Sequence, residues 1–171
     1  MKPFTKKLVL ENGREFLGYG YGANVERVCE IVFNTSVVGY QEILSDPSNI
    51  DQIVVMAYPL IGNYGIIESD FIGETKLSGY VVREWCEAPS NFRCDGDIDE
   101  YLKKEGIVGI CDVDTREITQ HIRENGVMKA KIVTDLADVE KVVEDFDYSN
   151  DSIKALKEEI LNAKDEEECI E

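Results

Sequence analysis

Basic residues and histidine are scarce in this sequence. Its 171 residues include 18 lysines and arginines against 35 aspartates and glutamates, which gives a formal net charge of −17, and only one histidine. Proteins that bind nucleic acid gain affinity by neutralising phosphates with lysine and arginine, and anionic membrane surfaces attract basic segments for the same reason. We therefore expect no nucleic acid and no membrane surface as a partner.

Long apolar runs are also missing. No stretch approaches the roughly 20 apolar residues that a membrane-spanning helix needs. The first seven residues, which include three lysines, lead directly into a strand-like segment without the apolar centre of a secretory signal. These features predict a cytoplasmic protein.

The cysteines do not form a recognisable framework. Their number is odd, and no two are spaced as Cys-x-x-Cys, so both a disulfide scaffold and a zinc site are disfavoured. The five cysteines are Cys29, Cys86, Cys94, Cys111 and Cys169. We expect free thiols that act mainly as small apolar side chains, and we expect no metal or cofactor in this chain.

What the sequence does contain is a series of short apolar segments separated by turn signals. Residues 6–10 and 15–21 flank Asn12-Gly13, a dipeptide that favours a tight hairpin turn. The nearly continuous apolar run at 52–57 predicts a strand that is buried on both faces. Further strands are expected at residues 28–34, 77–83, 107–111 and 128–133, and helices at 40–44, 98–104, 115–124, 136–146 and 150–164.

Strands dominate the first half of this series, and strands alternate with helices in the second half. That order predicts the α/β class, with an antiparallel sheet packed on a β-α-β layer. We expect one domain over residues 1–148, followed by a helical, acidic extension or the start of a linker over residues 149–171.

Two features have alternative interpretations. The glycines of Gly18-Tyr-Gly-Tyr-Gly22 are followed by a strand rather than a helix, which favours a glycine-rich strand end over a phosphate loop. His121 stands beside the apolar stripe of a predicted helix, with Glu117 four residues earlier. A solvated or rim histidine is the simpler interpretation, and a histidine phosphocarrier is the weaker alternative.

Three stretches carry a family resemblance. They are Val32-Phe-Asn-Thr-Ser36 with Gly39-Tyr-Gln-Glu-Ile-Leu-Ser-Asp-Pro-Ser48, then Gln52 to Gly65, then Gly109-Ile-Cys-Asp-Val-Asp-Thr-Arg116 continuing to Gly126. In this order and spacing the chain resembles the amino-terminal domain of the carbamoyl phosphate synthetase small subunit, over about residues 6–134. Two valines at positions 37 and 38, and Cys29, depart from the residues common in that family.

The resemblance implies a three-layer β/β/α swivelling domain and a role in making carbamoyl phosphate from glutamine, bicarbonate and ATP. It implies docking to the large subunit, which uses ATP and magnesium. It also implies that glutamine is cleaved by a separate carboxy-terminal glutaminase domain, and that Ser48 contacts the L-glutamine substrate. The alternative is a purely structural role, in which Ser48 stabilises the turn after Pro47.

The sequence does not carry the glutaminase pattern itself. Glutaminases of the related class place their nucleophilic cysteine between glycines and their histidine in a His-x-Glu pair, whereas Cys111 is followed by Asp112 and His121 by Ile122. We therefore expect no catalytic residue here and no turnover by this chain alone. A stand-alone binding or regulatory module remains the alternative, and the coding sequence that follows Glu171 distinguishes the two.

Overall fold

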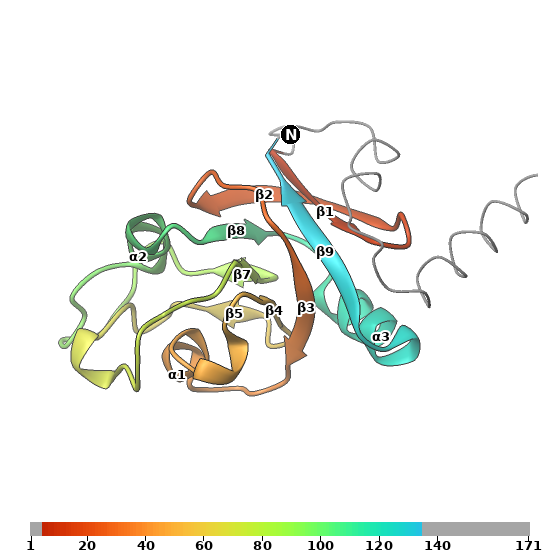
Figure 1. The fold of residues 1–171 in the computed structure, drawn as a ribbon. Helices are drawn as coiled ribbons and strands as arrows, with labels where there is room; N and C mark the ends of the chain where they lie inside the picture. Colours follow the sequence, from red (N-terminus) through yellow and green to blue (C-terminus); the bar gives the residue numbers. More distant parts are fainter. Residues whose placement is uncertain (1–4, 135–171) are drawn as a thin grey trace, which may run out of the picture.

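The computed structural model describes residues 5–134 of the chain (Figure 1). The helices expected at 136–146 and 150–164, the domain boundary at residue 148 and the extension over 149–171 lie outside the described residues. Within the described range, none of the helices combines the length and the apolar character that crossing a membrane requires.

The predicted hairpin at the start of the chain is confirmed. Strands β1 (Lys6–Leu10) and β2 (Glu15–Gly22) pair antiparallel, with Val9 opposite Glu15. The turn between them places Gly13 at a φ of 82°, a left-handed conformation that glycine adopts without steric cost.

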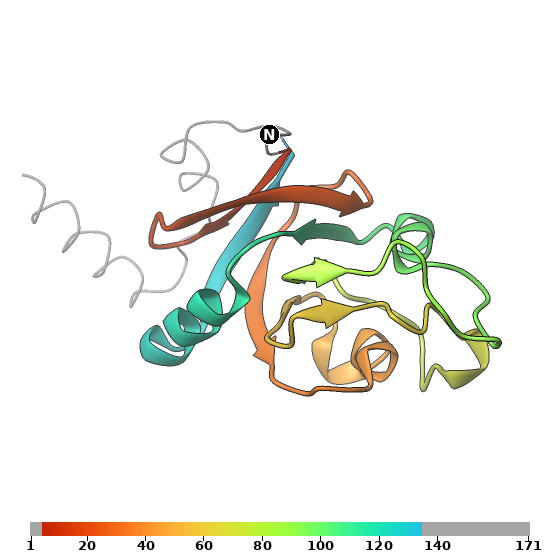
Figure 2. The same cartoon turned by 180° about the vertical axis from the view of Figure 1, so that it is seen from behind.

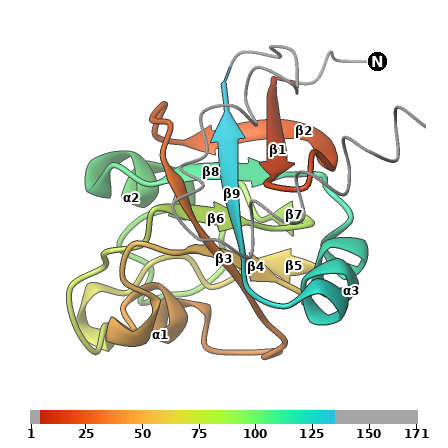
Figure 3. The same cartoon turned by 45° about the vertical axis from the view of Figure 1, so that its right-hand side comes forward.

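Seven strands join into one closed sheet in the order β1-β2-β8-β6-β4-β3-β9. The remaining five are β3 (Val28–Asn34), β4 (Ile53–Met56), β6 (Gly79–Val81), β8 (Val108–Cys111) and β9 (Met128–Val133). The pairs β3-β4, β4-β6 and β6-β8 are parallel, and the other four pairs are antiparallel. In Figure 3 strand β9 runs across β8 and β6.

The α/β class is therefore confirmed, but the relation between the two halves differs from the expectation of an antiparallel sheet packed on a separate layer. Strand β2 pairs with β8, and β3 pairs with both β4 and β9. The antiparallel half thus continues into the parallel half through hydrogen bonds at both edges, and the sheet has no free edge between them.

The parallel half forms the centre of the molecule because its strands are apolar on both faces. In β4 the side chains of Ile53 and Val55 belong to a core cluster inside the closed sheet. Those of Val54 and Met56 belong to a second cluster, which lies under helices α1 (Tyr40–Leu44) and α2 (Ile98–Glu105). The prediction of a doubly buried strand at 52–57 is confirmed.

Helices α2 and α3 (Thr115–Asn125) begin and end where their capping residues predict. The Asp97 carboxylate accepts a hydrogen bond of 2.8 Å from the amide of Glu100, and Gly106 ends α2 at a φ of 70°. The Asp114 carboxylate accepts from the amides of Arg116 and Glu117. Asp114 thus acts as the N-terminal cap of α3. Figure 2 shows α2 and α3 at opposite ends of the molecule.

Four short elements had no counterpart in the sequence predictions. Strands β5 (Leu60–Ile61) and β7 (Glu84–Trp85) form a separate parallel pair. Two 3-10 helices, η1 (Pro47–Asn49) and η2 (Glu68–Asp70), lie in the connections around β4 and β5.

Candidate functional site

Ser48, the residue expected to contact glutamine, lies exposed in the middle of η1. Asp46 begins this short helix, and its Oδ1 accepts a hydrogen bond of 2.8 Å from the Ser48 amide. Pro47 takes the first helical position, where its missing N–H group costs nothing. The backbone of Ser48 therefore stabilises the turn, while its side chain is on the surface.

The carboxylate of Asp46, next to Ser48, is held in its ionised form. Hydrogen bonds from Ser48, first from its amide and then from its hydroxyl, hold the pKa of Asp46 below its usual value. A serine hydroxyl can donate one hydrogen bond and accept others. The turn thus presents a hydroxyl and a negative charge side by side, which are groups that can bind the polar atoms of an amino acid.

Two buried polar side chains fix the position of this turn. Gln41 is 1% exposed, and its Nε2 donates to the carbonyl of Ile67 at 2.9 Å while its Oε1 accepts from the Ile67 amide at 2.8 Å. Ser45 is fully buried, and its hydroxyl donates to the carbonyl of Gln41 and accepts from the amide of Ile72. We call Gln41 and Ser45 the polar clamp, because together they attach α1 and its following turn to residues 67–72.

The sequence analysis did not single out the polar clamp. Both residues lie within or next to α1, where a polar side chain is ordinarily solvated. The available signal was their place within the stretch that carries the family resemblance, but one sequence cannot separate a buried glutamine from an exposed one. The partners of Gln41 and Ser45 become visible only in the structure, where the fold brings residues 67–72 next to α1.

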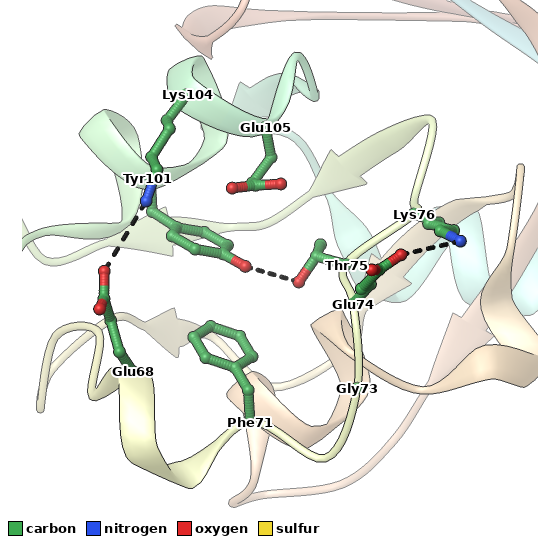
Figure 4. A pocket seen from close by; sticks show the side chains of 9 residues that line it. All are labelled: Glu68, Phe71, Gly73, Glu74, Thr75, Lys76, Tyr101, Lys104 and Glu105. Atoms are coloured by element: carbon green, nitrogen blue, oxygen red, sulfur yellow. Dashed lines mark hydrogen bonds and ion pairs between the residues drawn. The ribbon is translucent and has the colours of Figure 1, made fainter.

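A groove lies beyond the clamp, between α2 and the segment that follows η2 (Figure 4). It has a volume of about 520 Å³, and Phe71 stacks on Tyr101 inside it with ring centroids 5.0 Å apart. The hydroxyl of Tyr101 lies 2.7 Å from that of Thr75. The lining residues are Glu68, Phe71, Gly73, Glu74, Thr75, Lys76, Tyr101, Lys104 and Glu105.

Most charged side chains that line this groove are paired with an opposite charge. Lys76 lies 3.0 Å from Glu74, and Lys104 lies 3.7 Å from Glu68. Burial, together with the nearby carboxylates of Glu105 and Glu68, raises the pKa of Tyr101, so its phenol stays protonated. The groove therefore has no dominant charge and no ionised nucleophile.

His121 lies half-buried on α3, as expected of a rim histidine. Its Nε2 is 2.6 Å from Nδ2 of Asn12, and its Nδ1 is 3.3 Å from the Arg14 guanidinium, which also pairs with Glu117. Burial and the positive charge of Arg14 lower the pKa of His121. Both ring nitrogens face neighbouring side chains, which argues against a phosphocarrier role.

Cys111 is held as a neutral thiol. It ends β8, and its sulfhydryl lies 3.4 Å from the Tyr19 carbonyl. Burial is the main reason that its pKa is raised to about 11. A thiol with that pKa is a poor nucleophile at neutral pH, in agreement with the absence of a glutaminase pattern around it.

The glycine-rich segment Gly18–Gly22 lies inside β2 and pairs with β8, so its interpretation as a strand end is confirmed. Among residues 5–134 no three histidine, cysteine, aspartate or glutamate side chains gather closely enough to hold a metal ion. Of the residues singled out by the sequence, Ser48 has an exposed side chain on the turn that Asp46 caps.

Comparisons with known proteins agree with the resemblance. The family model "Carbamoyl-phosphate synthase small chain, CPSase domain" matches residues 8–132. The carbamoyl phosphate synthase small chains of Fusobacterium nucleatum and Clostridium perfringens are 50% and 47% identical over 141 and 146 residues, which cover 82% and 84% of this chain. The pyrimidine-specific small chain of Bacillus subtilis is 47% identical over 139 residues, or 81% of this chain.

These matches cover 39%, 42% and 38% of the three relatives, respectively. The chain therefore spans about two-fifths of the length of the curated relatives that it matches, and it corresponds to their amino-terminal part. This chain belongs to the carbamoyl phosphate synthase small chain family.

Proposed function

We propose that this chain is the amino-terminal part of a small chain that supplies ammonia from glutamine for the synthesis of carbamoyl phosphate from bicarbonate and ATP. Within that assembly Ser48 contributes to the glutamine site. The observation that carries this role is the exposed Ser48 on a turn whose geometry is fixed from behind by Asp46 and the polar clamp. A preorganised hydroxyl loses little entropy when a ligand binds it.

Cleavage of glutamine belongs, in this proposal, to a carboxy-terminal glutaminase domain that supplies the cysteine, histidine and glutamate. The half-buried, protonated thiol of Cys111 supports the view that this chain has no nucleophile of its own. ATP and magnesium act on the large chain, which is the docking partner, and no cofactor is assigned to this chain. The isolated chain should therefore be inactive.

The family also suggests where and in what form the protein works. We infer a heterodimer of small and large chains in the cytoplasm, serving pyrimidine synthesis as the name of the Bacillus relative indicates, and arginine synthesis as well. The three-layer swivelling arrangement is part of the same proposal. The antiparallel and parallel halves of the closed sheet would be its two β layers, and the helices its third.

The test compares Ser48→Ala with wild type in the full-length small chain assembled with its large chain. Loss of one hydrogen bond to the substrate, about 1–1.5 kcal/mol, should raise the KM for glutamine roughly 5–12-fold. Synthesis driven by ammonium salts should not change, because it bypasses glutamine. Ser36→Ala, on another exposed loop, is the matched control. An unaltered KM in Ser48→Ala would remove Ser48 from the site.

A further inference from the structure

Phe92 is almost completely exposed. It lies in the segment that joins β7 to α2, and 98% of its surface is accessible to solvent. Leaving a phenyl ring in water forgoes the roughly 1.5–3 kcal/mol that its full burial would contribute. Large aromatic side chains are also the commonest anchors of protein interfaces. An exposed phenyl ring of this kind is therefore a candidate anchor for another molecule.

The backbone around Phe92 is held in place. Asn91 bridges the tip, because its Oδ1 accepts from the Arg93 amide at 2.9 Å and its carbonyl accepts from the Cys94 amide at 3.2 Å. On either side, the amide of Ser90 donates to the Asn63 carbonyl and that of Asp95 to the Ile66 carbonyl.

Side-chain contacts add to this anchoring. The guanidinium of Arg93 lies 2.5 Å from Oδ1 of Asp70 and 3.2 Å from the Ser69 hydroxyl, so the tip is tied to η2. A ring on such a fixed tip can enter a pocket with little additional loss of backbone entropy.

The segment that carries Phe92 is acidic. Between residues 86 and 97 there are three acidic residues, Glu87, Asp95 and Asp97, and one basic residue, Arg93, which leaves a net charge of 1 − 3 = −2. The one base is already paired with Asp70 of η2. A matching partner surface therefore has an apolar pocket bordered by lysine or arginine.

We propose that Phe92 is the anchor residue through which this chain docks on the large chain, with the acidic border meeting basic groups around the receiving pocket. The inference rests on the proposed function, since that supplies the large chain as partner. A second copy of this chain is a poor occupant, because each copy brings the same acidic border and a formal charge of −17.

Arg93 ties the Phe92 tip to η2, and η2 lies at the side of the molecule opposite α3 in Figures 1 and 2.

The experiment measures the affinity of full-length small chain for large chain by biolayer interferometry. Removal of a hot-spot ring in Phe92→Ala should raise Kd by about 30-fold or more. Phe92→Trp should bind within about threefold of wild type, because it keeps an aromatic anchor. Glu87→Lys should slow association at low salt, since it reverses part of the charge that steers the encounter.

Val127→Ala is the matched control. Val127 is 78% exposed and lies between α3 and β9, on the opposite side of the molecule, so its truncation should leave Kd within about twofold. The thermal midpoint of Phe92→Ala should equal that of wild type, because the ring packs against almost nothing. A binding loss in a normally folded variant would then come from the interface.

The outcomes separate this inference from the function on which it rests. Wild-type small chain that does not bind the large chain contradicts both. Wild type that binds, together with a Phe92→Ala variant of equal affinity, overturns only the anchor role. A Phe92→Ala variant that changes self-association or glutamine cleavage, with an unchanged Kd for the large chain, assigns the surface to another occupant and also overturns the inference.

Discussion

Replacing Gln41 by leucine should destabilise the fold far more than its place in a five-residue helix suggests. Leucine has a similar volume, so the change removes hydrogen bonds and creates little cavity. The bonds at 2.9 and 2.8 Å to the carbonyl and amide of Ile67 are both lost. Gln41 and Ile67 are 1% and 5% exposed, so water has poor access to the two orphaned backbone groups.

Each buried backbone group that loses its partner costs about 1–3 kcal/mol. Some relaxation of residues 67–72 toward water reduces the sum, and we expect a loss of about 2–4 kcal/mol in the free energy of unfolding. For a chain of this size that corresponds to a thermal midpoint lower by roughly 5–15 °C. Urea unfolding followed by circular dichroism measures it directly, with the m-value unchanged if the variant folds to the same structure.

Glu42→Leu is the control, because this neighbouring side chain is exposed and should change stability by no more than about 0.5 kcal/mol. Gln41→Glu adds a pH test. A protonated glutamic acid can still donate to the Ile67 carbonyl, whereas a buried carboxylate cannot. Burial should raise the pKa of the introduced carboxyl in the folded state above its unfolded value of about 4.3. The variant should therefore lose further stability as pH rises above about 4.3. A loss below 1 kcal/mol in Gln41→Leu would refute the clamp.

Two further predictions concern the sheet. In Gly109→Ala the new methyl group would lie 2.6 Å from the buried ring of Tyr21, so overpacking should cost about 1–3 kcal/mol, and a calorimetric midpoint equal to that of wild type would contradict this packing. With a pKa of about 11, Cys111 has about 0.1% thiolate at pH 8, so peptide mapping after brief iodoacetamide treatment should find it unmodified. Extensive labelling there would mean a lowered pKa or local opening.

The sequence was sufficient for elements whose signals are local. The Asn12-Gly13 turn, the Asp97 cap and the glycine after α2 each act on residues within one turn of the chain, and each element begins or ends where predicted. The same holds for the continuous apolar run of β4, because burial on both faces requires apolar side chains at every position.

The closure of the sheet could not be predicted from such local signals. Strand β2 meets β8 through pairs such as Tyr19 with Cys111, which are 92 positions apart in the chain. Periodicity describes the faces of a strand but not its neighbour. The 18 residues between β3 and β4 did hold a clue, because parallel strands need a crossover of about a dozen residues or more, and a hairpin does not.

The position of Ser48 shows why a surface residue can depend on buried chemistry. A helix of five residues is too short to be stable alone, and α1 has no side-chain cap at its start. Its place is set instead by apolar packing of Leu44 and by the bonds of Gln41 and Ser45 to residues 67–72. Because η1 follows α1 directly, the position of the Ser48 hydroxyl depends on the hydrogen bonds of Gln41 and Ser45. The stretch from Gly39 to Ser48 therefore encodes two things at once, the group that faces the ligand and the buried contacts that hold it there.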